Sequence, residues 1–212
     1  MTKKLFWQDP YLTELDVCIT QVDGNDVQVD QTIFYAFSGG QESDAGTIGN
    51  RRVVQARKDG KAIVYTLDAD HGLQVGDQVR MAIDWTRRYQ LMRLHFAAEL
   101  ILELTYQQVA GIQKIGAHIA QDKSRIDFEW HENLVPLFPL LLEKAHALIA
   151  ADYPITSAFS DEENQRRYWE IEGFARVACG GTHLKRTEEV GEIMLKRKNV
   201  GKGKERIEIT VK

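Results

Sequence analysis

The sequence predicts an α+β protein in which a small antiparallel β-barrel is followed by a two-layer α/β sandwich. Between residues 14 and 84, short segments of alternating polarity are separated by turn signals, which is typical of a barrel of short strands. After Trp85 a long helical periodicity begins, and strand-like segments return between and after the helices. We therefore expect two domains, a barrel with a glycine-rich loop at residues 1–85 and an α+β domain at residues 86–212.

The first half contains the strand signals. Leu15, Val17 and Ile19 alternate with less apolar neighbours, which is the period of a half-buried strand. The dipeptide Asp59-Gly60 is a hairpin signal between two further segments of this kind. The expected strands of this half are residues 15–19, 27–29, 51–57, 62–67 and 78–84.

The second half mixes helices with strands. Apolar residues at steps of three and four predict an amphipathic helix from about Arg87 to about Val109. A second long helix is expected to end at about Ala151, and Asp161 is expected to cap a short helix that runs to about Glu170. The expected strands of this half are residues 115–119, 125–130, 154–159, 174–178, 192–198 and 206–211.

The composition predicts a soluble cytoplasmic protein. The chain has 212 residues and 43% hydrophobic content, enough for a real core, and no run approaches the roughly 18 apolar residues of a membrane span. The N-terminal residues show no signal-peptide pattern, and two cysteines are too few for a disulfide framework. The formal net charge of −4 argues against wholesale electrostatic binding of nucleic acid but permits local basic patches. We expect no membrane and no DNA partner.

Four side chains at two i, i+4 spacings predict a metal site. His95 and Glu99 lie on one face of the predicted helix, about 5–6 Å apart. Cys179 and His183 flank Gly180-Gly181, a pair that predicts a tight loop rather than a helix. Each pair alone is at least as often structural as metal-binding. Together they form a Cys/His₂ set with one carboxylate, which suits a borderline-soft, tetrahedral ion.

Five short motifs follow one another along the chain. They lie at residues 34–46, 87–98, 122–128, 179–183 and 201–207, and they include Ser38-Gly39-Gly40-Gln41, Met92-Arg93-Leu94-His95 and Cys179-Gly180-Gly181-Thr182-His183. In type and order these motifs resemble those of the editing domain of alanyl-tRNA synthetases and of its free-standing relatives, the AlaX-type alanyl-tRNA editing proteins. Five separated motifs in the right order make the resemblance specific.

The resemblance implies a hydrolase that acts on transfer RNA for alanine. The substrate would carry serine by mistake, with glycine as a further candidate, and the reaction would be hydrolysis of the aminoacyl ester. A pocket shaped for alanine cannot strongly exclude glycine, which is smaller, or serine, which adds only a hydroxyl, so a second site removes the errors. Because no phosphate-cradling loop precedes a helix, we expect the chain to act in trans, with transient contact with the translation machinery.

The resemblance also implies roles for individual residues. One zinc ion would be held by His95, Glu99, Cys179 and His183. Catalysis would involve His95, Glu99 and Gln41. Substrate contacts would come from Ser38, Gly39, Gly40, Arg93, His118, Lys202, Lys204 and Arg206, of which the last three would meet phosphates of the acceptor end.

The sequence departs from the family pattern at Glu99, where a second histidine is usual. A carboxylate also binds zinc, so Glu99 is a fourth ligand, or a general base beside a metal with three protein ligands, or a residue with another use in a site that has lost its metal. Ser38 also stands where a third glycine is usual, which is a milder change.

Three other functions stay open from the sequence. The first is a threonyl-type editing domain, which also removes serine, although the loop Ser38–Gln41 favours the alanyl type. The second is a non-catalytic tRNA-binding module that keeps the fold without turnover. The third is a metal-dependent hydrolase of small esters or amides, which would turn over its substrate without RNA.

Overall fold

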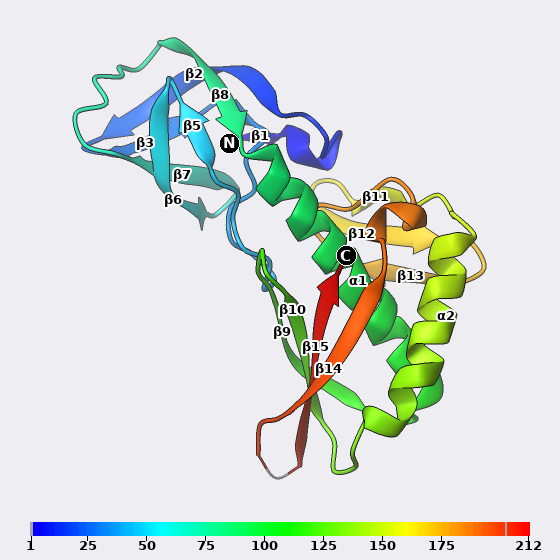
Figure 1. Ribbon diagram of the computed structural model, residues 1–212. Helices are drawn as coiled ribbons and strands as arrows, with labels where there is room; N and C mark the ends of the chain where they lie inside the picture. Colours follow the sequence, from blue (N-terminus) through cyan, green and yellow to red (C-terminus); the bar gives the residue numbers. More distant parts are fainter. Residues whose placement is uncertain (1, 202) are drawn as a thin grey trace. The chain divides into compact units, whose positions relative to one another are not determined.

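The computed structural model describes residues 2–201 and 203–212. These residues form two compact units, each of which is described by itself (Figure 1). The first unit contains the residues up to Ser38 together with Glu42–Tyr89, and the second contains Gly39–Gln41 together with Gln90–Lys212. The glycine-rich loop is therefore divided between them after Ser38.

Six antiparallel strands of the first unit close into a barrel in the order β2-β3-β7-β6-β5-β8. The strands are β2 (Glu14–Asp23), β3 (Asp26–Val29), β5 (Gly46–Ile48), β6 (Arg51–Asp59), β7 (Ala62–Leu67) and β8 (Gln78–Ile83). Val17 and Ile19 of β2 are buried, as the alternation of the sequence predicts for one face of a strand. A short parallel pair, β1 (Lys3–Lys4) and β4 (Gln31–Thr32), and the 3₁₀ helix η1 (Leu5–Trp7) complete the unit.

A fully buried ion pair in the first unit anchors the start of helix α1 (Trp85–Gln108). The Arg88 guanidinium donates to both carboxylate oxygens of Asp44, with Nε 2.8 Å from Oδ1, and also to the carbonyl oxygens of Pro10 and Ile33. Buried charges are tolerated only when they are paired and hydrogen-bonded. Arg88 and Asp44, which both belong to the motifs of the sequence, therefore have a structural role here.

The second unit consists of two antiparallel sheets and two helices. The four-stranded sheet has the order β14-β15-β10-β9 and the three-stranded sheet has the order β11-β12-β13. Its elements are β9 (Gln113–Ile119), β10 (Ser124–Glu129), η2 (Val135–Leu137), α2 (Phe138–Ala150), β11 (Thr156–Asp161), β12 (Arg166–Ile171), β13 (Ala175–Ala178), η3 (Thr187–Val190), β14 (Ile193–Asn199) and β15 (Lys204–Val211). Helix α2 packs against β14, where His146 accepts a hydrogen bond from the amide of Ile193 (3.1 Å).

Helix α1 contacts both sheets of the second unit, which explains its burial. Leu91 and Leu94 pack with Ile119 of β9, and Phe96 packs edge-to-face on Trp169 of β12 with ring centroids 5.1 Å apart. The predicted bounds of this helix are correct to within two residues at each end. The predicted amphipathic character is wrong, because a helix that packs on two sides keeps no wide polar face.

The short helix predicted from Asp161 to about Glu170 is wrong. Residues 162–165 form a turn after β11, and the carboxylate of Asp161 accepts hydrogen bonds from the backbone amide (3.0 Å) and the side-chain amide (2.7 Å) of Asn164. The chain continues as β12, whose residues alternate between buried and more exposed. An aspartate that binds a nearby backbone N–H favours a turn as readily as the start of a helix, so the capping signal was ambiguous.

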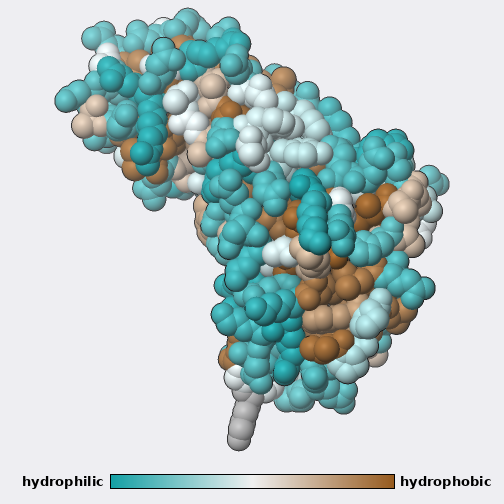
Figure 2. Space-filling view, in the orientation of Figure 1, coloured by the Kyte–Doolittle hydropathy of each residue, from teal (hydrophilic) through white to brown (hydrophobic). Residues whose placement is uncertain are grey.

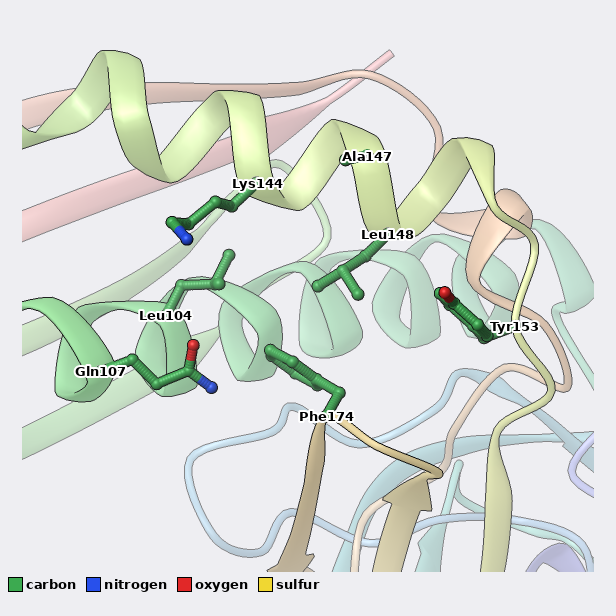
Figure 3. A pocket seen from close by; sticks show the side chains of 7 residues that line it. All are labelled: Leu104, Gln107, Lys144, Ala147, Leu148, Tyr153 and Phe174. Atoms are coloured by element: carbon green, nitrogen blue, oxygen red, sulfur yellow. The ribbon is translucent and has the colours of Figure 1, made fainter.

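Neither long helix, within the residues that the structure describes, has the length and apolar composition needed to cross a membrane. Apolar residues do gather on one exposed face of the second unit in Figure 2. A pocket of about 260 Å³ opens between α1 and α2 (Figure 3), and it is lined by Leu104, Gln107, Lys144, Ala147, Leu148, Tyr153 and Phe174. None of these side chains is a histidine, a cysteine or a carboxylate, so the chemistry predicted from the sequence lies elsewhere.

Candidate metal centre

Three side chains that are far apart in the sequence meet in the second unit. The ligand atoms of His95, Cys179 and His183 all lie within 4.8 Å of one another. The sulfur of Cys179 is 3.5 Å from Nε2 of His95 and 3.2 Å from Nε2 of His183. Both imidazoles are buried and the thiol is partly buried, so the three donors face a point with little access to bulk water.

The loop that carries Cys179 depends on a glycine. Cys179 follows β13, and its amide donates to the carbonyl oxygen of Arg167 on β12 (2.9 Å). A Cβ atom at Gly181 would lie 2.1 Å from Cε1 of His95, much closer than real Cβ atoms approach other heavy atoms. Residue 181 is therefore glycine because the His95 ring occupies the space that a side chain would need.

The outer nitrogen of each imidazole is held by another side chain. Nδ1 of His95 is 2.8 Å from Oε1 of Gln41, and Nδ1 of His183 is 3.0 Å from the hydroxyl of Ser157. Histidines that bind metals almost always have this second hydrogen bond, which fixes the ring and its tautomer. Both Nε2 atoms are thereby directed towards the sulfur of Cys179.

The contacts of Gln41 determine the tautomer of His95. The Nε2 group of Gln41 donates to the hydroxyl of Thr182 (2.9 Å), so its Oε1 atom is the one that faces His95. A carbonyl oxygen only accepts, and Nδ1 of His95 must therefore carry the proton. The lone pair of a neutral His95 ring then lies on Nε2, on the side of Cys179.

The glycine-rich loop places Gln41 by pairing with β9. The amide of Ile119 donates to the carbonyl oxygen of Gly40 (2.8 Å), and Gln41 forms a parallel bridge with Ile119. Gly40 has φ +87°, and a Cβ atom there would lie 2.5 Å from the carbonyl oxygen of Ala117. The loop therefore lies close against the edge of the four-stranded sheet, and a side chain at residue 40 would prevent this approach.

The three donors fit a tetrahedral metal ion. Bonds of about 2.0–2.3 Å to nitrogen, oxygen and sulfur hold the ligand atoms of such an ion roughly 3.3–3.6 Å apart. The observed separation from Cys179 to His95 is 3.5 Å, within this range, and that to His183 is 3.2 Å, just below it. The donor set of two imidazoles and one thiolate also suits zinc and other borderline-soft ions.

Glu99 lies next to these three residues. Its Oε1 atom is 3.2 Å from Nε2 of His95, one turn away on α1, and its side chain is largely buried. It is not one of the three residues whose ligand atoms all lie within 4.8 Å. The carboxylate is therefore adjacent to the donors, in a position to act on a group bound there.

Burial and neighbouring charges shift the pKa values of the titratable groups of the centre, some upwards and some downwards. Burial, together with the charge on His95, lowers the pKa of His183 to about 3. Burial also disfavours a charged His95, but Cys179 and Glu99 outweigh it and raise the pKa of His95 to about 10. Burial raises the pKa of Glu99, and His95 more than reverses this, to about 2. A metal ion must therefore displace the proton of His95, which makes metal affinity fall as the pH falls.

The other residues that we expected to contact the substrate have neighbours other than the three donor side chains. Ser38 lies in the first unit, where its hydroxyl accepts a hydrogen bond from Lys58 (2.6 Å). Arg93 donates from Nε to the carbonyl oxygens of Glu189 and Val190, both at 3.1 Å, which ties α1 to η3. Gly39 belongs to the same loop segment as Gln41 and has φ +60°.

The residues expected near phosphates and near the acyl group lie on the four-stranded sheet. His118 is on β9, opposite Arg125 of β10. Lys204 is exposed at the start of β15. Arg206, on the same strand, donates from Nε (2.5 Å) and Nη2 (3.0 Å) to the carboxylate of Asp127. Lys202 lies outside the described residues.

Sequence reasoning gave no role to three residues that border the centre. Thr182 fixes the amide of Gln41, Ser157 binds His183, and Arg167 is buried close enough to Cys179 for their charges to interact. Thr182 lies within the motif Cys179–His183, so its position next to the centre could have been predicted from the sequence. Ser157 and Arg167 carry no local signal, because they reach the centre only through the pairing of β11, β12 and β13.

Comparison with known proteins places the chain among relatives of aminoacyl-tRNA synthetases. The profile "tRNA synthetases class II (A)" matches residues 10–87, and the profile "Threonyl and Alanyl tRNA synthetase second additional domain" matches residues 168–208, which include Cys179 and His183. The chain is 35% identical to the alanyl-tRNA editing protein AlaX-M of Pyrococcus horikoshii, over 99% of this chain and 97% of that protein. It is 34% identical to AlaX-M of Saccharolobus solfataricus over the whole of both chains.

The chain is also similar to one segment of larger enzymes. It is 34% identical to the alanine–tRNA ligase of Ignicoccus hospitalis over 92% of this chain but only 24% of the ligase. The chain therefore belongs to a class of proteins that are related to one segment of alanine–tRNA ligases. Within that class, the chain belongs to the family of AlaX-type alanyl-tRNA editing proteins.

The geometry predicts how metal binding responds to substitution. We expect the full chain to bind one Co²⁺ ion, used as a probe, with the charge-transfer absorption of a cobalt–thiolate bond. Gln41→Leu and Ser157→Ala remove partners of the imidazoles but no ligand, and each should weaken Co²⁺ binding about 10- to 100-fold. Cys179→Ala should abolish the absorption, whereas Cys18→Ala in the first unit should not change it. A full cobalt–thiolate band in Cys179→Ala would contradict the assignment.

Proposed function

We propose that this protein hydrolyses the ester bond of alanine transfer RNA mischarged with serine, and that it uses a zinc ion at the candidate metal centre. Glycine is a second candidate for the amino acid removed. One observation carries the proposal: Nε2 of His95 and Nε2 of His183 meet the sulfur of Cys179, while other side chains hold both Nδ1 atoms. Membership of the alanyl-tRNA editing family supports the substrate class.

His95, Cys179 and His183 would hold the zinc ion, and a set of three protein ligands is typical of catalytic rather than structural sites. When bound, zinc supplies Lewis acidity at this point, directed at water or at the ester carbonyl. Gln41 keeps the lone pair of His95 on Nε2, and Thr182 keeps the amide of Gln41 in the required orientation.

Glu99 would act as the proton acceptor. With three donors already present, a fourth protein ligand would close a tetrahedral site to water and substrate. The carboxylate is held beside Nε2 of His95, and a cation next to it, whether the protonated ring or a bound metal ion, favours its ionised form. Oε1 of Glu99 would therefore take a proton from the water that attacks the ester, which is general-base catalysis.

Transfer RNA would be the partner, and the cytoplasm would be the place of action because the substrate is an intermediate of translation. On β15, Lys204 would be the phosphate contact, since Arg206 is already engaged by Asp127. The relatives that carry the alanyl-tRNA editing name favour alanine over threonine transfer RNA as the substrate.

The direct test is deacylation by protein of known zinc content. We expect rapid loss of serine from seryl-tRNA(Ala), because Glu99 would lie beside the ester held at the centre and would accept the proton of the attacking water. We expect alanyl-tRNA(Ala) to be spared. Seryl-tRNA(Thr) should be a poorer substrate, and a small seryl ester without RNA should be hydrolysed poorly. Absence of turnover on seryl-tRNA(Ala) at full zinc occupancy would refute the proposal and favour an RNA-binding module without catalysis.

Substitution at Glu99 separates a general base from a metal ligand. Glu99→Gln keeps the size of the side chain but removes the base, so we expect normal zinc content and a kcat about 10²- to 10⁴-fold lower. Glu103→Gln, one turn further along α1, is the matched control and should retain kcat. If Glu99→Gln instead lost zinc and activity in parallel, Glu99 would be a fourth ligand.

A further inference from the structure

Three lysines gather in the first unit, which does not contain the candidate metal centre. Lys58 near the end of β6 and Lys61 in the turn before β7 are exposed, and Nζ of Lys58 donates to the hydroxyl of Ser38 at 2.6 Å. Lys4 of β1 is buried, with its Nζ atom 4.7 Å from the ring centroid of Trp7. We call Lys4, Lys58, Lys61 and the adjoining Phe37-Ser38 the barrel patch.

The lysines of the barrel patch are close enough to affect one another's charge. Burial, together with the charges of Lys58 and Lys61, lowers the pKa of Lys4 to about 8. Burial also lowers the pKa of Lys58. Like charges that are held together in this way create a local positive potential on a chain whose net charge is −4. An anion bound at the patch would relieve this repulsion.

An exposed aromatic residue directly precedes the serine that Lys58 contacts. Phe37 has 54% of its surface exposed and directly precedes Ser38, whose hydroxyl is held by Lys58. A single exposed apolar side chain is common on protein surfaces, so what distinguishes Phe37 is the lysine that contacts its neighbour. An aromatic face beside ammonium groups is the combination with which proteins bind single-stranded nucleic acids, because the bases stack and the phosphates are neutralised.

We propose that the barrel patch binds the unpaired 3′ end of the RNA substrate, with Lys58 and Lys61 on its phosphates and Phe37 stacked on a base. The inference rests on the proposed function, because that function makes transfer RNA the substrate. Lys4 is buried and close enough to Lys58 and Lys61 for their charges to interact, so it adds to the positive potential. The hydrogen bond from Lys58 to Ser38 holds the lysine and the loop together. An acidic protein partner would also contact the lysines, but its binding would not depend on unpaired bases, so the two partners can be told apart by experiment.

The charge contribution is tested by binding of uncharged alanine transfer RNA to the full chain, measured by fluorescence anisotropy at several KCl concentrations. Lys58→Gln/Lys61→Gln should weaken binding and lower the slope of log K against log [KCl] by about 1.4, since each phosphate contact on a single strand contributes about 0.7. Arg51→Gln/Arg52→Gln removes the same charge at the other end of β6, roughly 20 Å away along the strand, and should leave the slope nearly unchanged. Equal slopes for the two double variants and the wild type would overturn the proposal.

The stacking contribution is tested with the same RNA lacking its unpaired 3′ nucleotides. Phe37→Ala should weaken binding of the intact RNA about 5- to 100-fold, and Phe37→Trp should retain affinity because it keeps an aromatic face. With the shortened RNA, wild type and Phe37→Ala should bind equally. An equal loss on both RNAs, or no loss on either, would overturn the assignment of an unpaired base to Phe37.

These measurements do not depend on catalysis, because the RNA carries no ester. If seryl-tRNA(Ala) is not hydrolysed but the RNA effects appear, the proposed hydrolysis fails and the barrel patch stands. If hydrolysis proceeds and neither the lysines nor Phe37 affects binding, the barrel patch fails and the proposed function stands.

Discussion

The absence of a side chain at Gly181 is the constraint on which the metal centre depends. The ring of His95 fills the space next to that residue, and any Cβ atom there would collide with it at 2.1 Å. Through this contact the loop from Cys179 to His183 lies against α1, so that both Nε2 atoms reach the sulfur. The two i, i+4 pairs, which are far apart in the sequence, become one set of donors only because this approach is possible.

A second glycine, Gly40, is needed for a close approach that places one of the side chains around the metal centre. Gly40 lets the chain pair with β9, and this pairing brings Gln41 to Nδ1 of His95. Ser157 holds His183 in the same way from β11. A metal site that is rigid before the metal arrives loses little entropy on binding, and ligand orientation is set by such outer contacts. The glycines thus serve the chemistry indirectly, by allowing polar side chains to be placed.

The clustered side chains His95, Cys179 and His183 were easier to find from the sequence than the residues that hold their rings in place. His95, Cys179 and His183 were accessible because i, i+4 spacing has a direct spatial meaning on a helix and in a tight loop. The role of Ser157 could not be predicted, because Ser157 reaches His183 through sheet pairing, which leaves no local pattern in the sequence. The strand that carries Trp169 was misread as a helix because the capping signal of Asp161 outweighed a period-2 alternation. The description of the whole chain as a small barrel followed by a two-layer sandwich stays a prediction, although the individual strands lie close to the expected positions.

X-ray absorption at the zinc edge of the zinc-loaded full chain tests the central claim most directly. The account predicts one sulfur ligand at about 2.3 Å and nitrogen or oxygen ligands at about 2.0–2.1 Å, with the imidazole contribution of two histidines. Cys179→Ala should lose the sulfur contribution. A first shell without sulfur in the wild-type protein, or one with several sulfurs, would contradict a metal centre built from His95, Cys179 and His183.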